Sequence, residues 1–254
     1  MRLNLFWVTM QFMTRLPIPE KWARGVHFRQ YWRGVPNFPL IGLIVGGLAG
    51  LIFISISQFG GGVYIGAIGY VLALALLTGG LHLDGVANTC NDLFTAHKHK
   101  REKMREMIRD NRLGTYGSLG LIFCISLKTL AVFELSYYPP LHLLALLTCA
   151  PIVGRAAVVL LMYGQRYAHE DMGMGSYYIG QVTSSSTILT LLGGSVLVMA
   201  LGNWQGLSAM MMTFLVIYGL AFYFNYRLGG QTDGTLGASI EAGEVIFLLA
   251  MIWQ

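Results

Sequence analysis

The sequence predicts an all-α integral membrane protein, a polytopic helical bundle of about seven spans, with six as the alternative count. Of the 254 residues, 55% are hydrophobic and only 11% are charged, whereas ordinary soluble domains carry about 25% charged residues. Long apolar runs recur along the chain, and a helix needs about 20 such residues to cross a bilayer. Because little length remains outside these runs, we expect one membrane-embedded domain over residues 1–254.

The N-terminal part of the chain predicts an interfacial segment followed by two spans. Residues 3–13 form an apolar run that is too short to cross a bilayer and is expected to lie in the headgroup region. The first span is expected over residues 38–57 and the second over residues 63–78. The first carries a stripe of small residues that lets another helix approach closely, at Gly42, Gly46 and Gly50.

The remainder of the chain predicts a surface helix and five further spans. If residues 95–112 form a helix, Met104, Met107 and Ile108 lie on one side of it and the charged residues lie elsewhere. That pattern is typical of an amphipathic helix at a membrane surface. A Gly-rich connector over residues 229–237 precedes the last span. The five spans are expected over residues 117–135, 141–163, 186–201, 207–226 and 238–253.

The basic residues indicate how the chain is oriented. Most of the 17 Lys and Arg lie in two blocks, and none lies between Arg33 and Lys98. Because positive loops stay in the cytoplasm, both blocks should face that side, with two spans between them. Topology therefore accounts for the net charge of +5 without nucleic-acid binding. The lipid bilayer is the predicted surrounding, and a homo-oligomer stays an open alternative.

A polar and acidic stretch follows the second span directly. At helical spacing, Asp84, Asn88, Asn91 and Asp92 share one face. Oxygen ligands on one face suit a hard cation such as Mg²⁺, and carboxylates next to a membrane span usually mark a site. The alternative is a polar helix end that merely leaves the bilayer.

Other charged residues lie in or against apolar runs. Lys128, Glu134 and Arg155 are expected to snorkel or to pair with one another, and Arg155 could instead bind a carboxylate or a phosphate. The acidic residues near the last span fall at its cytoplasmic end. The stretch around Asp84 follows the second span and is predicted on the same side of the membrane. This one-sided grouping favours a reaction cleft open to the cytoplasm over an ion path, which needs polar groups at several depths.

Five motifs, in this order, resemble the cobalamin synthase family, also called adenosylcobinamide-GDP ribazoletransferase. They are TRLPIP at 14–19, FPLIG at 38–42, TGGLHLDGVANT at 78–89, MIRDNRLGTYG at 107–117 and LGGQTDGTLGASIEAGE at 228–244. The resemblance extends over essentially the whole chain. It implies a multi-pass, Mg²⁺-dependent enzyme of the bacterial inner membrane with a cytoplasmic active face.

The activity that the resemblance implies is a late step of cobalamin biosynthesis. The adenosylcobinamide phosphate group is transferred from adenosylcobinamide-GDP to the 5′ oxygen of α-ribazole, or of α-ribazole 5′-phosphate, and GMP leaves. Such a transfer needs positioning and charge neutralisation more than covalent help from the protein.

The resemblance also implies roles for particular residues of this sequence. Arg109 and Arg112 would offset charge on the leaving GMP, and His82 or a carboxylate would accept the proton of the attacking hydroxyl. Arg155, Asp110 and Gln231 are the expected substrate-binding residues. The expected magnesium ligands are drawn from Asp84, Asn88, Asn91, Asp92, Asp233, Glu241 and Glu244.

The sequence departs from the family pattern at the expected metal ligands. Asn88 and Asn91 stand where the family has aspartates, and Asp233 and Gly234 are exchanged. An amide offers an oxygen but no charge, and a one-residue shift turns a helical side chain by about 100°. An inactive homologue is therefore one alternative. The others are a different membrane phosphotransferase, whose usual arginine is absent after Ala87, and a transporter.

Overall fold

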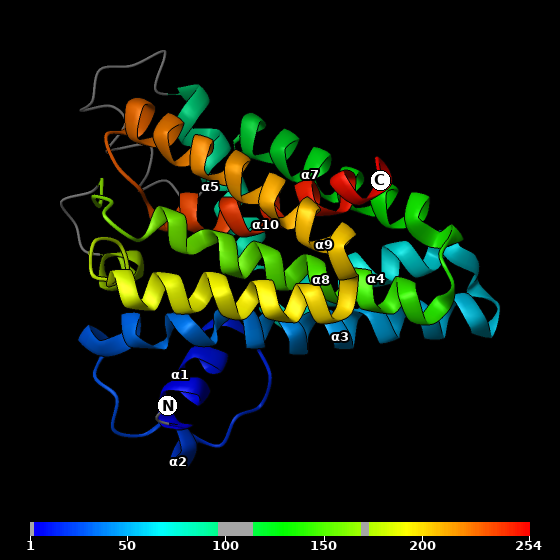
Figure 1. Ribbon diagram of the computed structural model, residues 1–254. Helices are drawn as coiled ribbons and strands as arrows, with labels where there is room; N and C mark the ends of the chain where they lie inside the picture. Colours follow the sequence, from blue (N-terminus) through cyan, green and yellow to red (C-terminus); the bar gives the residue numbers. More distant parts are fainter. Residues whose placement is uncertain (1–2, 96–113, 169–172) are drawn as a thin grey trace.

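The structure, a computed structural model, describes residues 3–95, 114–168 and 173–254, and within these ranges it is an all-α bundle without β-strands (Figure 1). The predicted fold class is confirmed, whereas the surface helix expected over residues 95–112 lies almost wholly outside the described residues. The α-helices are α1 (Leu3–Met13), α2 (Glu20–Ala23), α3 (Phe38–Ile56), α4 (Gly62–Thr78), α5 (Leu81–Thr95), α7 (Thr115–Glu134), α8 (Pro140–Ala157), α9 (Ser184–Leu228) and α10 (Asp233–Ile252).

Five continuous helical segments of the described chain are long and apolar enough to cross a membrane. Two of them contain a break. Phe28–Thr78 turns at Ser57–Gly61, where Gly60 has φ 99°, and Ser184–Leu228 turns at Asn203, which has φ 53°. In Figure 1 the chain reverses direction at both breaks. Divided there, the segments correspond to the seven predicted spans, and the crossing of a membrane by each of them stays a prediction.

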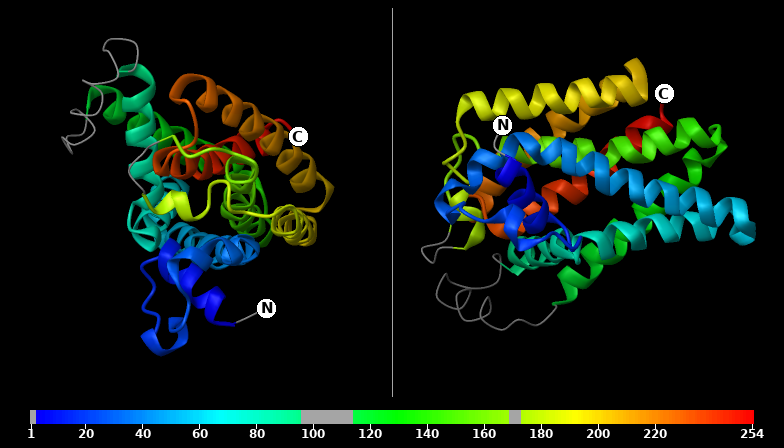
Figure 2. Two further views of the ribbon diagram at one scale, coloured as in Figure 1. Left: turned by 90° about the vertical axis from the view of Figure 1, so that its left-hand side faces the viewer. Right: turned by 90° about the horizontal axis from the view of Figure 1, so that it is seen from below.

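Two helices form the centre of the bundle. The segment Pro140–Leu161 has 83% of its apolar window buried and Asp233–Ile252 has 72%, compared with 22% for Thr115–Tyr137. Figure 2 shows α8 and α10 in the middle, with the other long helices around them. The predicted small-residue stripe of α3 lies against α8, because a Cβ at Gly42 would stand 2.5 Å from the carbonyl oxygen of Pro151.

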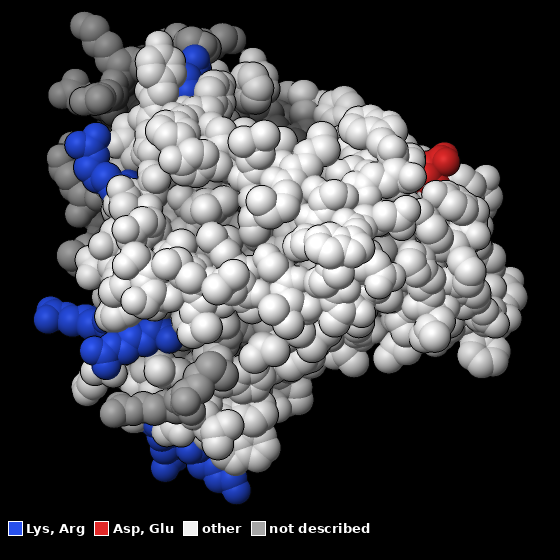
Figure 3. All heavy atoms as spheres, viewed as in Figure 1, with Lys and Arg blue, Asp and Glu red and all other residues white. Residues whose placement is uncertain are grey.

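Charge is distributed unevenly between the two ends of the bundle. In Figure 3 the Lys and Arg side chains gather at one end, and acidic side chains in that view lie at the other. The basic end is where α4 leads into α5 and where α9 leads into α10 (Figure 1). Gly79 and Gly80, with φ of 65° and 73°, make the whole connection between α4 and α5. That left-handed conformation suits glycine.

The start of the last helix differs from the sequence-based prediction. We expected a connector over residues 229–237, but α10 already begins at Asp233. Thr232 and Thr235 form a capping box in which each side chain bonds the other residue's backbone N–H, at 3.1 and 2.8 Å. The cap starts the helix despite Gly234 and Gly237, whose low helix propensity misled the prediction.

Those two glycines are where α10 crosses α5. A Cβ on Gly85 of α5 would stand 2.7 Å from the Cα of Gly237 and 2.8 Å from the carbonyl oxygen of Gly234. The contact is between backbones, so neither side can give way by rotating a side chain. The polar stretch of α5 and the first turns of α10 are therefore held together by residues of two sequence motifs that lie far apart in the chain.

We expect Gly85→Ala to destabilise the protein by about 1–3 kcal/mol, the usual cost of overpacking. Gly47→Ala in α3 is the matched control, because a Cβ there meets no atom within 4 Å. Thermal unfolding of the two purified variants in detergent would measure the difference. Equal melting temperatures would show that the α5–α10 backbone contact is not needed for stability.

Candidate functional site

The polar face of α5 is present at the start of that helix. Asp84 and Asn88 are both exposed, and the amide Nδ2 of Asn88 donates a hydrogen bond of 2.9 Å to Oδ2 of Asp84. Asp84 lies in the first helical turn, where the positive end of the helix dipole favours a carboxylate. The structure thus brings together two of the predicted oxygen ligands, one turn apart.

The other polar residues of α5 are used differently. The side-chain oxygen of Asn91 accepts a hydrogen bond of 2.7 Å from the backbone N–H of Gly117, in the first turn of α7. Asn91 therefore ties α5 to α7, and its acceptor is engaged by the protein. Asp92 is half-buried at the next position. The predicted metal roles of Asn91 and Asp92 stay predictions.

Asp233 stands exposed at the first position of α10. Its Oδ1 accepts a hydrogen bond from the backbone N–H of Gly175, and its Oδ2 accepts one of 3.3 Å from the Tyr167 hydroxyl. Burial and then the nearby Asp233 carboxylate raise the pKa of Tyr167 to about 12, so this hydroxyl remains a donor at neutral pH. The Asp233 carboxylate is thereby turned toward the segment that follows α8.

Asp233 is nevertheless next in sequence to a contact with α5. A Cβ on Gly234 would stand 3.1 Å from Oγ1 of Thr89 and 3.4 Å from Cβ of Asn88. The Asp84–Asn88 pair and Asp233 therefore belong to one region at the basic end of the bundle, on the two sides of the α5–α10 crossing.

Glu241 and Glu244 lie deeper, in a buried group that we call the charge cluster: Lys128, Arg155, Glu241 and Glu244. Lys128 Nζ donates to Oε2 of Glu241 and, at 2.6 Å, to Oε2 of Glu244. Arg155 Nη1 donates to Oε1 of Glu244 at 2.9 Å. The cluster contains two cations and two carboxylates and is charge-balanced.

This arrangement bears on three sequence-based predictions. Of the two partners expected for Arg155, the structure shows a carboxylate, and the side chain is completely buried. Glu241 and Glu244 are paired with cations instead of lying beside Asp84, which argues against the predicted metal role for both. The prediction that Lys128 snorkels or pairs with Glu134 or Arg155 is wrong, because its partners are Glu241 and Glu244 of α10.

Gln231, predicted to bind substrate, is a buried connector between helices. Its Nε2 donates to the carbonyl of Ala221 at 3.0 Å, and its Oε1 accepts from Thr235 Oγ1 at 3.1 Å. Its backbone N–H donates to the carbonyl of Arg166 at 2.7 Å. The side chain fixes the turn from α9 into α10, and being fully buried it offers no surface to a substrate.

His82, predicted as a proton acceptor, does not share the face of Asp84. The two residues are two positions apart, which is about 200° around a helix, and His82 is 2% exposed. Burial, and then the nearby Arg155 and Lys128, lower the pKa of His82 well below 6.5, so the ring is neutral at physiological pH. Among the described residues, neither ring nitrogen has a hydrogen-bond partner. The ring faces a cavity rather than the polar face of α5.

The remaining predicted residues are Arg109, Asp110 and Arg112, which lie outside the described residues.

The sequence did not predict the two hydrogen-bond donors to Asp233, Tyr167 and Gly175. They belong to a segment that the sequence marks only as rich in Gly and Tyr, and 66 and 58 residues separate them from Asp233. Separations of that size leave no periodic signal.

The donors that the structure gathers fit a magnesium ion held jointly with a substrate. In the described parts of the chain, no three His, Cys, Asp or Glu side chains lie close enough to hold a metal by themselves. Asp84 and Asn88 offer one carboxylate and one amide at the exposed start of α5. Mg²⁺ is often bound by one or two carboxylates, with phosphate oxygens and water completing its coordination.

Helices of this length and hydropathy, surrounding buried ion pairs, define a multi-pass membrane protein with a polar site at its basic end. The family model described as cobalamin-5-phosphate synthase matches residues 5–252. The adenosylcobinamide-GDP ribazoletransferase of Citrobacter koseri is 44% identical over 250 residues, which cover 98% of this chain and 99% of that protein. The chain belongs to the cobalamin-5-phosphate synthase family, which confirms the resemblance of the motifs. No solved structure matches it.

The charge cluster predicts an unequal response to two variants. Lys128→Met alone leaves two buried carboxylates with one cation, which should cost about 3–5 kcal/mol of stability. Lys128→Met combined with Glu241→Gln restores the charge balance and should recover much of that loss. Thermal unfolding in detergent would test this, with the exposed Lys21→Met as the control. A double variant no more stable than the single one would contradict it.

Proposed function

We propose that this protein transfers the adenosylcobinamide phosphate group from adenosylcobinamide-GDP to the 5′ oxygen of α-ribazole, or of α-ribazole 5′-phosphate, with release of GMP. The reaction completes the nucleotide loop of cobalamin. The observation that carries the proposal is family membership over nearly the whole chain, including 44% identity to a protein named for this reaction. The exposed polar residues at the α5–α10 crossing support it.

Asp84 and Asn88 are the residues proposed to hold Mg²⁺ with the diphosphate of the donor. When bound, the ion supplies positive charge that neutralises diphosphate oxygens. The Asn88 amide donates to Asp84 and so fixes the direction of the carboxylate. Asn88 in place of a carboxylate leaves one negative charge fewer beside the diphosphate, so that more of the cation's charge acts on the substrate.

The proton of the attacking hydroxyl needs an acceptor on the exposed side of the crossing. Asp233 is better suited to this than His82, because it is exposed and next in sequence to the contact between Gly234 and Asn88. The Gly175 N–H and the Tyr167 hydroxyl would orient its carboxylate. Transfer of the proton to Asp233 accompanies attack of the 5′ oxygen on phosphorus and departure of GMP.

Arg109 and Arg112 are proposed to offset the charge of the leaving GMP. Their segment follows α5 directly, and Gly114, the first described residue after it, lies against Asn91: a Cβ there would stand 2.5 Å from the Asn91 side-chain oxygen. The described residues on either side of the two arginines, Thr95 and Gly114, therefore lie in or against α5, which supports a role for the arginines at the same site.

A transporter would need a hydrated path of polar groups through the bundle. The charge cluster is the feature that would favour one, since it lies far from the ends of α7 and α10. Its side chains are at most 6% exposed and are ion-paired with one another. The side chains of the cluster therefore line no aqueous path, and this favours an enzyme over a transporter.

The enzyme is proposed to reside in the inner membrane with its basic end in the cytoplasm, because positive segments stay on that side. The C-terminus lies at the opposite end of the bundle (Figure 1). A reporter fused after Gln254 should therefore show periplasmic activity. A reporter that is active only in the cytoplasm would rule out the proposed orientation.

Asp84→Asn should lower the rate of GMP release by more than about 100-fold, a typical effect of removing one electrostatic group from a transfer site. The assay combines purified protein, adenosylcobinamide-GDP, α-ribazole and Mg²⁺. Glu134→Gln is the matched control, because it makes the same change at an exposed carboxylate that ends α7. Undiminished turnover of Asp84→Asn, with the control also active, would remove Asp84 from the mechanism.

A further inference from the structure

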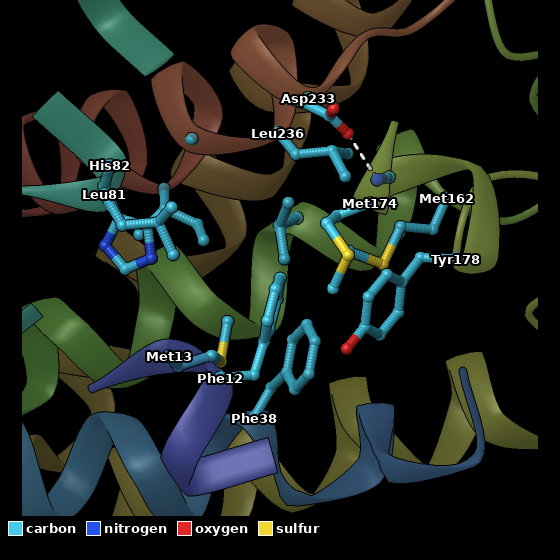
Figure 4. A pocket seen from close by; sticks show the side chains of 14 residues that line it. Phe12, Met13, Phe38, Leu81, His82, Met162, Met174, Tyr178, Asp233 and Leu236 are labelled. Atoms are coloured by element: carbon cyan, nitrogen blue, oxygen red, sulfur yellow. Dashed lines mark hydrogen bonds between the residues drawn. The ribbon is translucent and has the colours of Figure 1, made fainter. Parts of the chain in front are cut away.

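A cavity of about 210 Å³ lies at the basic end of the bundle, bounded by α1, α3, α5, α10 and the segment after α8. Its walls are mainly aromatic rings and thioethers (Figure 4). Figure 4 shows His82 on one side and Met162, Met174 and Tyr178 on the other. The wall includes Phe12, Phe38, Met162, Met174, Tyr178 and His82.

His82 distinguishes this cavity from ordinary apolar packing. The ring is 2% exposed, and neither of its nitrogens has a partner among the described residues. A buried polar group without a partner is costly, and most such groups are satisfied. An imidazole in the wall of an apolar cavity therefore indicates a ligand that is mostly apolar and carries one hydrogen-bonding atom.

The aromatic side chains in the wall favour a ligand that has a ring of its own. The rings of Phe12 and Tyr178 stack with centroids 5.6 Å apart and planes at 27°, and Phe38 approaches Tyr178 at 6.1 Å. Methionine side chains adapt to ring edges and pack favourably against them. A cavity of about 150 Å³ is large enough to bind benzene, so 210 Å³ suits a bicyclic ring system.

The cavity shares one residue with the candidate active site, Asp233, which is among the residues that line it. Leu81 and Met174 in its wall are 42% and 39% exposed, and Asp233 lies at its rim. Asp233 is followed by Gly234, which lies against Asn88 and Thr89. A ligand that fills the cavity can therefore reach Asp233, the proposed proton acceptor at the first position of α10.

We propose that this cavity binds the aromatic base of the acceptor nucleoside. The base of α-ribazole is a dimethylated benzimidazole, which is flat, bicyclic and apolar at its methylated edge, with one unsubstituted ring nitrogen. The His82 N–H donates to that nitrogen, the base lies among Phe12, Phe38 and Tyr178, and the ribose extends past Asp233. The inference rests on the proposed function, which supplies the identity of the acceptor.

The first test measures binding without catalysis. Protein in lipid nanodiscs is dialysed against 5,6-dimethylbenzimidazole or against 5,6-dimethylindane, which has the same shape but no ring nitrogen. His82→Phe should weaken binding of the benzimidazole by about tenfold, the effect of one lost hydrogen bond, and leave the indane within twofold. Met174→Trp, which fills the cavity, should abolish both. Unchanged benzimidazole binding by either variant would overturn the proposal.

The second test separates this inference from the proposed function. Met174→Trp should raise the KM for α-ribazole at least tenfold and leave the KM for adenosylcobinamide-GDP within twofold. Met211→Trp, at an exposed position of α9, should change neither. Normal GMP release with an unchanged KM for α-ribazole would refute the cavity assignment alone. Absence of GMP release from the wild-type protein, with the base still bound, would refute the proposed function alone.

Discussion

The contact between the backbones of α5 and α10 is the constraint on which the rest of the site depends. Gly85 lies against Gly234 and Gly237, and no side chain larger than hydrogen fits between them. That contact sets Asp84 and Asn88 on one side of α5 and His82 on the other, with Asp233 at the start of the second helix. The Asp84–Asn88 pair and the aromatic cavity therefore lie on opposite sides of α5, at the point where it crosses α10. The glycines in both motifs have a packing role that is separate from any chemistry.

The charge cluster holds α10 in place deeper in the bundle than its crossing with α5. Lys128 and Arg155 neutralise the two glutamates of α10 within the bundle, and the pairs join α7, α8 and α10. Buried pairs of this kind add little net stability compared with apolar packing, but the loss of one partner is costly. Because the pairs tie α10 to both α7 and α8, they restrict the rotation and depth of α10 in the bundle. Gln231 and the capping box fix the first turn of that helix.

The sequence alone predicts most of the fold, because span-length apolar runs dominate it, and even the Gly42 stripe pairs with a close neighbour as expected. It also predicts the Asp84–Asn88 pair, since helical periodicity is a local property. What it misses depends on distant partners. The roles of Glu241 and Glu244 follow from Lys128, more than 100 residues earlier. The direction of Asp233 follows from Tyr167, and the early start of α10 follows from a cap that outweighs two glycines.

The charge cluster also constrains how the protein is made. Its two cations lie in α7 and α8, whereas both carboxylates lie in α10, which follows those helices in the chain and is therefore synthesised after them. Until that helix arrives, Lys128 and Arg155 lack the two glutamates as counter-ions, and an unpaired charge within a membrane-spanning helix costs at most about 2.5–3.5 kcal/mol, the value for the helix centre. Insertion of α10 thus completes the neutralisation. A chain truncated before α10 would keep Lys128 and Arg155 in lipid without their counter-ions. Membrane quality-control proteases could distinguish that state from the folded protein.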